Sequence, residues 1–164
     1  MVYLRKMEEN DIDFVISCLK DTTERFMSQW GGGACYEYPV TSEQVQKRFN
    51  NRDENIIYFI IMNDDQAIGS VELTITALSQ RECTVNRFMI AEQWRSKGYG
   101  TMALNLLKEY AFNNMRMKKL LLSVAEHNVG AIKCYENAGF HEYDRVSRIK
   151  LWKSILMEIV NTTA

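Results

Sequence analysis

Arg95-Ser-Lys-Gly98-Tyr-Gly100 follows an apolar run that ends at Ile90, and a helical pattern begins directly after it. Gly98 and Gly100 allow positive φ angles and let a ligand come close to the backbone where a Cβ would block it. Consecutive N–H groups in such a turn, together with the free N–H groups at a helix start, bind anions. Arg95 and Lys97 add positive charge. The stretch predicts a phosphate or pyrophosphate site; a glycine-rich turn that only reverses the chain is the plainer alternative.

Two well-known nucleotide motifs are missing from the sequence. The P-loop pattern G-x-x-x-x-G-K-[ST] does not occur, and no G-x-G-x-x-G opens a helix after the first predicted strand. The phosphate site is therefore neither of the P-loop type nor of the dinucleotide-binding type.

A second stretch, Asn128-Val-Gly-Ala131-Ile-Lys-Cys-Tyr135-Glu136-Asn-Ala-Gly139-Phe140, predicts a helix with both of its ends defined. Asn128 is a favourable N-cap, and Gly139 stands where a helix often ends in a left-handed residue. Ala131, Tyr135 and Ala138 fall on one face of this helix. Small residues beside one phenol indicate a groove with a single hydroxyl group. A core tyrosine bonded to the backbone is the alternative interpretation.

The two stretches together resemble the acetyl-CoA motifs of the GNAT superfamily of N-acetyltransferases. Arg95-x-x-Gly98-x-Gly100 is similar to its pyrophosphate loop, and Asn128-x-x-Ala131-x-x-x-Tyr135-Glu136-x-x-Gly139-Phe140 resembles its second cofactor motif. The resemblance implies a single domain over residues 1–164 and transfer of an acetyl group from acetyl-CoA to a primary amine. The amine would attack directly, through a tetrahedral intermediate. A non-catalytic module that binds acetyl-CoA or a partner is the rival function.

The resemblance also implies where acetyl-CoA binds. The residues expected to hold it are Phe88, Met89, Ile90, Arg95, Ser96, Lys97, Gly98, Tyr99, Gly100, Thr101, Asn128, Ala131 and Tyr135. Backbone N–H groups near Phe88 to Ile90 are the expected donors to the oxyanion. Tyr135 is the expected general acid, because its ordinary pKa of about 10 lies close to the value of about 8.5 for the leaving thiol.

The general base is less well defined. An amine with a pKa of about 10.4 is almost fully protonated at neutral pH, so a base or an ordered water must help. Thr84 and Ser123 occupy the positions at which some family members have a glutamate. Glu72, expected on the polar face of its strand, is the first candidate, ahead of Glu82 and Glu126. A water relay without a single base is the alternative.

Acceptor specificity is expected in the segment from Trp30 to Tyr38. Trp30, Tyr36 and Tyr38, with Glu37 among them, would line an amine pocket with aromatic rings and one carboxylate. A loop whose aromatic residues cover the edge of the core is the alternative. The sequence leaves open whether the acceptor is a polyamine, an amino acid, an antibiotic amine or a protein amine. His127 and His141 lack the spacing of metal ligands, so no metal is expected.

Composition limits the partners and the location. The chain has 164 residues, which suits one domain with its own core, and a net charge of −1 without a basic block. We therefore expect no nucleic acid partner. No apolar run approaches the length of a membrane span, and the N-terminus resembles a strand rather than a signal peptide. Cys18, Cys35, Cys83 and Cys134 show no C-x-x-C spacing, which favours reduced thiols and a cytoplasmic location. A homodimer is left open.

Periodicity predicts an α/β (α+β) fold with a mixed, mostly antiparallel seven-stranded sheet and four or five helices. Strands are expected at 2–7, 56–62, 71–77, 83–90, 119–124, 140–146 and 155–160. Helices are expected at 11–20, 22–29 and 42–50, from Gly100 or Thr101 onward, and from Asn128 onward. By resemblance, the central strands that end near Ile90 and Val124 splay apart, and the pantetheine arm of the cofactor lies between them.

Overall fold

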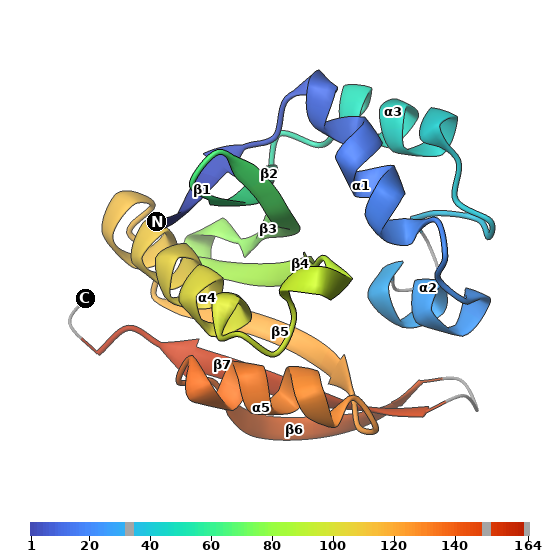
Figure 1. The fold of residues 1–164 in the computed structure, drawn as a ribbon. Helices are drawn as coiled ribbons and strands as arrows, with labels where there is room; N and C mark the ends of the chain where they lie inside the picture. The colour runs from blue at the N-terminus through green and yellow to red at the C-terminus, as the bar shows by residue number, and fades with distance from the viewer. Residues whose placement is uncertain (32–34, 149–151, 163–164) are drawn as a thin grey trace.

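The computed structural model describes residues 1–31, 35–148 and 152–162, and these form one seven-stranded sheet in the order β1-β2-β3-β4-β5-β7-β6 (Figure 1). The strands are β1 (Val2–Lys6), β2 (Ile56–Asn63), β3 (Gln66–Ala77), β4 (Glu82–Ile90), β5 (Lys119–Ala125), β6 (His141–Arg148) and β7 (Trp152–Val160). The β4–β5 pair is parallel, and the other neighbouring pairs are antiparallel. The predicted mixed, mostly antiparallel sheet is confirmed.

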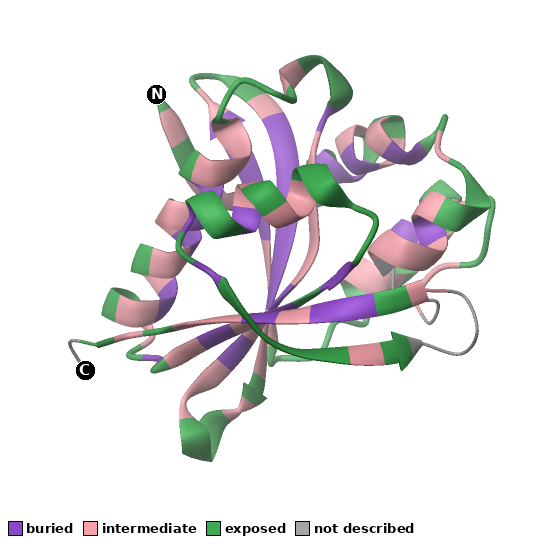
Figure 2. Cartoon of the chain, turned by 90° about the horizontal axis from the view of Figure 1, so that it is seen from below, coloured by how far each residue is buried: buried purple, intermediate pink, exposed green. Residues whose placement is uncertain are grey.

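Helices cover both faces of the sheet. They are α1 (Ile12–Leu19), α2 (Glu24–Gly31), α3 (Ser42–Asn50), α4 (Tyr99–Glu109), which continues into a π-helical turn, and α5 (Val129–Asn137). One core cluster joins α1, α2 and α3 to the sheet, and the larger cluster joins α4 and α5 to the opposite face. Figure 2 shows that the buried residues concentrate in the central strands, whereas the edge strand β6 is mostly exposed.

Two irregularities in β4 shape the centre of the sheet. The β4–β5 ladder has only three pairs, from Glu82↔Lys119 to Thr84↔Leu121, while β5 pairs with β7 along its length. The second half of β4 therefore separates from β5, as the resemblance implied. The register with β3 also shifts between Ser70 and Glu72, so that two residues of β4, Arg87 and Phe88, lie opposite one residue of β3. Arg87 has a φ of 47°, and such a bulge bends the strand.

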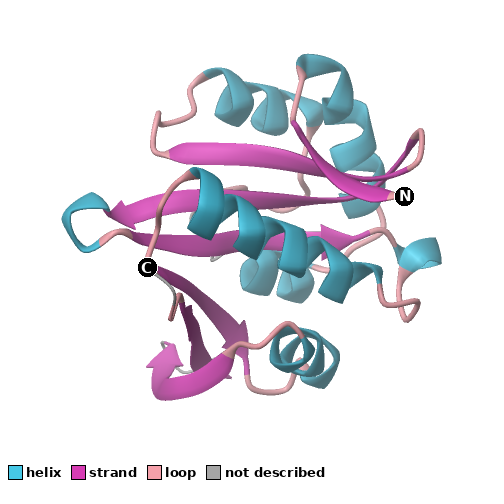
Figure 3. Cartoon of the chain, turned by 90° about the vertical axis from the view of Figure 1, so that its left-hand side faces the viewer, coloured by secondary structure: helices cyan, strands magenta, loops and turns pink. Residues whose placement is uncertain are grey.

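The halves of the sheet differ in direction. In Figure 3 the strands near the C-terminus run at a steep angle to the other strands, with α5 packed beside them. The early end of the β4–β5 ladder separates the C-terminal half of β4 from β5, and we call this separation of the two strands the opening. Loop 95–98, at the start of α4, and helix α5 both belong to the α4–α5 face at this opening.

The structure differs from the sequence predictions at three places. Helix α4 begins at Tyr99, one residue before the predicted start. Glu72 is buried rather than solvated, because the face of β3 on which it lies is covered by the first three helices. The helix break predicted from Trp30 to Gly33 does not begin at Trp30, because α2 continues to Gly31; Gly32 and Gly33 fall outside the described residues.

Candidate active site

The loop before α4 has the geometry of an anion-binding turn. Ser96 and Gly98 both have left-handed backbones, with φ of 59° and 82°, and Gly98 is the N-cap of α4. A Cβ added at Gly98 would meet no atom within 4 Å, so the space beside it is open. In the described part of the chain, the N–H groups of residues 96–101 donate to no other protein group. The next N–H along the chain, that of Met102, donates to the Gly98 carbonyl at 3.1 Å. A cluster of free amide donors at a helix start fits a pyrophosphate.

Gly100 has a different reason to be glycine. A Cβ at this position would lie 2.8 Å from Sγ of Cys134 in α5, closer than atoms can approach without a shift. The hydroxyl of Thr101 is 3.7 Å from the same sulfur. Gly100 therefore lets α4 and α5 pack closely, which brings the loop and the second motif together.

The two cations of the loop contact its own backbone. Nε of Arg95 donates to the Ile90 carbonyl at 2.8 Å, and Nζ of Lys97 donates to the Gln93 carbonyl at 2.9 Å. The Lys97 ammonium also lies 5.5 Å from the centre of the Trp94 ring. These bonds hold both charges beside the turn and fix them near the expected pyrophosphate.

Both predicted ends of helix α5 are confirmed. The Asn128 side chain accepts a hydrogen bond from the Ala131 N–H at 3.2 Å. At the other end the Phe140 N–H donates to the Tyr135 carbonyl at 3.0 Å, and the Gly139 N–H donates to Glu136 at 2.9 Å. With a φ of 95° at Gly139, this is a Schellman motif. The two caps fix which face of the helix turns toward the sheet.

Tyr135 lies on that inner face. Its side chain is buried in the larger core cluster, with its ring centre 6.0 Å from Phe88 and 6.1 Å from Phe140. Burial raises the pKa of the phenol above its ordinary value. Within the described residues its hydroxyl forms no hydrogen bond, so the backbone partner of the alternative interpretation is not observed. The hydroxyl is a neutral donor without a protein acceptor.

The end of β4 borders the opening. Phe88 and Ile90 pack on the α4–α5 face, whereas Met89 belongs to the core beneath the first three helices. Because the β4–β5 ladder ends at Thr84, the backbone of Phe88 to Ile90 lies beyond the last paired residue. This segment is where the oxyanion donors are expected.

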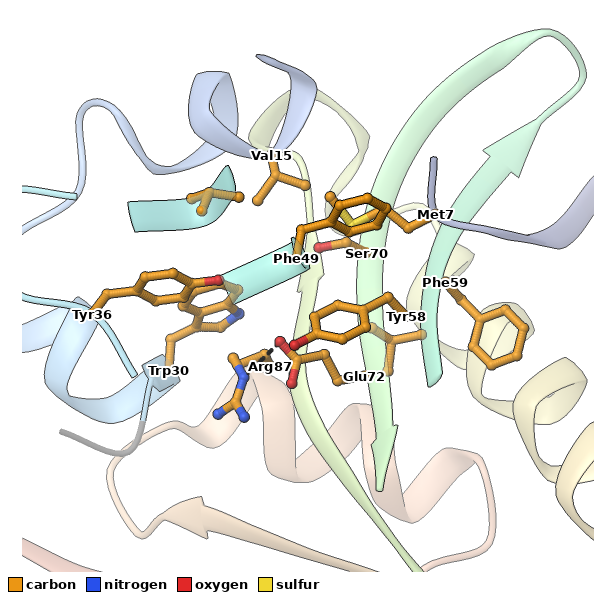
Figure 4. Close-up of a pocket in the computed structure, with 12 residues that line it drawn as sticks. Met7, Val15, Trp30, Tyr36, Phe49, Tyr58, Phe59, Ser70, Glu72 and Arg87 are labelled. Atoms are coloured by element: carbon orange, nitrogen blue, oxygen red, sulfur yellow. Dashed lines mark ion pairs between the residues drawn. The ribbon is translucent and has the colours of Figure 1, made fainter. Parts of the chain in front are cut away.

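A cavity on the opposite face of β4 brings two predicted acceptor residues together. Trp30 and Tyr36 stack with ring centres 6.0 Å apart, and the cavity between them and the sheet is also lined by Phe49, Tyr58, Glu72 and Arg87 (Figure 4). The cavity is small, because only about 20 Å³ of it can hold the centre of a water molecule. The structure does not bring Glu37 and Tyr38 into this cavity: both are exposed, and the Glu37 N–H bonds to Gln44. The carboxylate of the cavity is that of Glu72.

Glu72 is held by two arginines. Its Oε2 lies 2.9 Å from Nη2 of Arg48, and its Oε1 lies 2.7 Å from Nε of Arg87. The Glu72 side chain is 6% exposed, so these charges interact with little screening by water. Arg48 and Arg87 were not identified from the sequence, and an arginine within the apolar strand β4 was the one available signal.

The described residues contain neither a metal-binding cluster nor a membrane-spanning helix. Across residues 1–31, 35–148 and 152–162, no group of three or more His, Cys, Asp or Glu side chains is arranged to hold a metal ion. Over the same ranges, no helix is long and apolar enough to cross a bilayer.

Comparison with known proteins decides the family. The model of the acetyltransferase (GNAT) domain matches residues 2–141. The chain belongs to the GNAT acetyltransferase family. Among the relatives, the probable N-acetyltransferase YjcK of Bacillus subtilis (strain 168) is 23% identical over 147 residues, covering 86% of this chain and 81% of YjcK. The spermidine N(1)-acetyltransferase of Vibrio cholerae is 27% identical over 143 residues, covering 85% of this chain and 78% of the relative.

Solved structures of GNAT proteins confirm the fold. The spermidine N-acetyltransferase from Vibrio cholerae, in complex with CoA and spermine, gives a TM-score of 0.82 at 23% identity and covers 97% of this chain and 95% of its own. The aminoglycoside acetyltransferase AAC(6')-Ib, in complex with ribostamycin and coenzyme A, gives 0.80 at 24% identity, covering 97% and 93%.

Family membership confirms the class of activity inferred from the two motifs. This GNAT chain is an N-acetyltransferase that uses acetyl-CoA as the donor and an amine as the acceptor. The rival interpretation, a non-catalytic module, is not supported by these relatives.

Proposed function

We propose that acetyl transfer takes place at the β4 bulge, with acetyl-CoA on the α4–α5 face and the acceptor amine in the cavity on the other face. One observation carries this proposal. Phe88 contacts the Tyr135 ring on one face, while its neighbour Arg87 lines the cavity on the other. The opening where β4 leaves β5 would connect these two faces. An amine entering from the cavity would therefore meet a thioester held near Tyr135.

The proposed donor site uses the residues expected from the sequence. The free N–H groups of residues 96–101 would bind the pyrophosphate, with Arg95 and Lys97 beside it. Asn128 and Ala131 would border the pantetheine arm at the start of α5. The backbone of Phe88 to Ile90 would donate to the oxyanion, at the place where β4 is paired with β3 but lacks a partner on its β5 side.

Tyr135 is the proposed general acid. Its hydroxyl, at the end of a largely buried side chain, has no acceptor in the described part of the protein, so it is available to the sulfur that leaves. Because burial raises its pKa, the phenol keeps its proton and acts first as a hydrogen-bond donor. Proton transfer follows as negative charge develops on the sulfur, which is the step that a positioned acid accelerates.

A water relay is the proposed route for the proton of the amine. Glu72 remains the carboxylate nearest to the acceptor cavity. Both of its oxygens already contact guanidinium groups, Oε2 that of Arg48 and Oε1 that of Arg87, so neither is free to contact the amine. Its ion pairs therefore support a positioning role for Glu72, with water as the immediate base.

We further propose that the enzyme acts on a small-molecule or peptide amine in the cytoplasm. The four cysteines, Cys18, Cys35, Cys83 and Cys134, are free thiols. The absence of any disulfide among them supports a reducing compartment.

Acetyl-CoA should be converted to CoA faster when a suitable amine is present. Because the protein has four free cysteines that would react with thiol reagents, CoA should be measured by chromatography. For at least one member of an amine panel we expect release about 10²-fold or more above hydrolysis without amine. Binding of acetyl-CoA in calorimetry, without amine-dependent release for any amine, would contradict catalysis at this site.

A further inference from the structure

The charged groups at the acceptor cavity are unbalanced. Among the described residues that line the cavity, Glu72 and Arg87 are the charged ones. Arg48 is not part of this lining but pairs with Glu72 and so adds a second guanidinium group. Two positive charges thus share one negative charge. The Arg48 guanidinium also lies 5.9 Å and 5.8 Å from the ring centres of Tyr36 and Tyr58, so the aromatic walls already hold a cation.

Hydrogen-bond donors in the cavity exceed acceptors. Nε1 of Trp30 and the hydroxyl of Tyr58 are buried and have no hydrogen-bond partner among the described residues. The indole N–H can only donate. Burial raises the pKa of Tyr58 to about 12, and the charge of Glu72 contributes to the same shift. This hydroxyl therefore also keeps its proton. The ion pair of Arg87 with Glu72 runs through Nε at 2.7 Å, and within the described residues no nitrogen of the Arg87 guanidinium donates a hydrogen bond, so all of them are further donors.

A polycation does not fit this arrangement. A second ammonium group would enter a site of net positive charge, where the single carboxylate is already paired twice. Desolvated charges of the same sign repel strongly, and such repulsion excludes wrong partners. The site therefore differs in chemistry from one made for spermidine or an aminoglycoside.

We infer that the acceptor of this enzyme is an amine that also carries an anionic group, such as the carboxylate of an amino acid or a phosphate. The inference rests on the proposed function, in which the amine reaches the β4 bulge through this cavity. The anionic group accepts hydrogen bonds from Arg87, Trp30 and Tyr58, while the amine end faces the opening. A carboxylate matches the planar guanidinium of Arg87 through paired hydrogen bonds. The cavity is narrow, so one end of a small acceptor enters it.

Matched pairs of acceptors test the inference on the unaltered protein. Each of a set of α-amino and ω-amino acids is compared with its own amide, phosphoethanolamine is compared with ethanolamine, and spermidine and kanamycin serve as polycations. Affinity for the protein–CoA complex is measured by calorimetry, and kcat/KM by CoA release. We expect the anionic member of at least one pair to bind about 10-fold or more tightly than its uncharged partner, since hydrogen bonds to charged groups are the stronger ones.

The two readouts separate this inference from the proposed function. Tight binding of an anionic amine without acetylation would support an anion site in the cavity but contradict the proposed function, and with it the role of that amine as acceptor. Acetylation of spermidine or of the amides at least as efficiently as the acids would overturn the inference alone. Failure of every anionic member to bind better than its partner would also overturn it. The amide has the less basic amine and is intrinsically more reactive at neutral pH, so a preference for the acid would come from the site.

A substitution identifies the residue responsible. Arg87→Gln should weaken binding of the preferred anionic amine about 10-fold or more and change binding of its amide little. Arg145→Gln is the matched control, because Arg145 pairs with Glu142 at the exposed strand β6 and lies outside the cavity. Equal losses for the acid and the amide would assign Arg87 a structural role only. If Arg87→Gln does not fold, the comparison of each anionic amine with its uncharged partner on the unaltered protein still tests the inference.

Discussion

Tyr135→Phe should lower kcat by about 10²-fold or more while acetyl-CoA affinity and thermal stability stay close to those of the unaltered protein. The substitution removes one oxygen that has no hydrogen-bond partner in the described structure, and it keeps the ring that packs against Phe88 and Phe140. Single-turnover acetylation, calorimetry with acetyl-CoA and thermal melting measure the three quantities. Tyr143→Phe is the matched control, because Tyr143 is an exposed tyrosine on β6.

The pH dependence of the same pair of proteins distinguishes a proton donor from a packing residue. Because burial raises the pKa of Tyr135, its phenol remains protonated at about pH 10, where an ordinary tyrosine loses its proton. The ratio of the unaltered rate to the Tyr135→Phe rate should therefore stay constant from neutral pH to about pH 10. An acyl donor with a more acidic thiol should reduce this ratio, since its sulfur needs less help to leave. Full activity of Tyr135→Phe on a competent amine would leave this tyrosine with a packing role only.

The local structure of the two segments that form the proposed donor site could be predicted from the sequence because it depends on neighbouring residues. Both ends of α5 depend on residues within that helix and its flanks, and Asn128, Gly139 and Phe140 form the bonds that their types suggest. The loop before α4 likewise takes its shape from its own residues, with Gly98 in the left-handed conformation. Short-range hydrogen bonds and backbone preferences act within a few residues, so a single sequence contains their signal.

The acceptor cavity could not be predicted in the same way because it is assembled from distant segments. Glu72 in β3 meets Arg48 from α3 and Arg87 from β4, and none of these contacts is visible in local spacing. Alternation in β3 placed Glu72 on a polar face, but three helices cover that face and bury it. The bulge at Arg87 depends on the register between β3 and β4, which a sequence pattern does not fix.

Gly98→Val should reduce acetyl-CoA affinity by about 10²-fold or more, enough to abolish binding in calorimetry at ordinary concentrations. Gly98 has a φ of 82°, and a β-branched residue in this region costs on the order of 1–3 kcal/mol. The new side chain would also fill the open space beside the free N–H groups of the turn. Gly98→Asn separates the two causes, since asparagine tolerates the left-handed conformation but still carries a Cβ. Loss of affinity in both variants would show that close approach of the ligand is what requires glycine.

A second glycine supplies the control for packing. Gly100→Ala should lower thermal stability, because its Cβ would lie 2.8 Å from Sγ of Cys134. Cys134→Ala removes that sulfur, so the double variant should recover most of the lost stability. At Gly98→Val nothing described lies within 4 Å of the Cβ, so its cost in melting temperature comes from backbone strain and should not be restored by Cys134→Ala, while its loss of acetyl-CoA affinity is the additional effect. Unchanged acetyl-CoA affinity in Gly98→Val, with the protein folded, would remove the loop before α4 from the cofactor site.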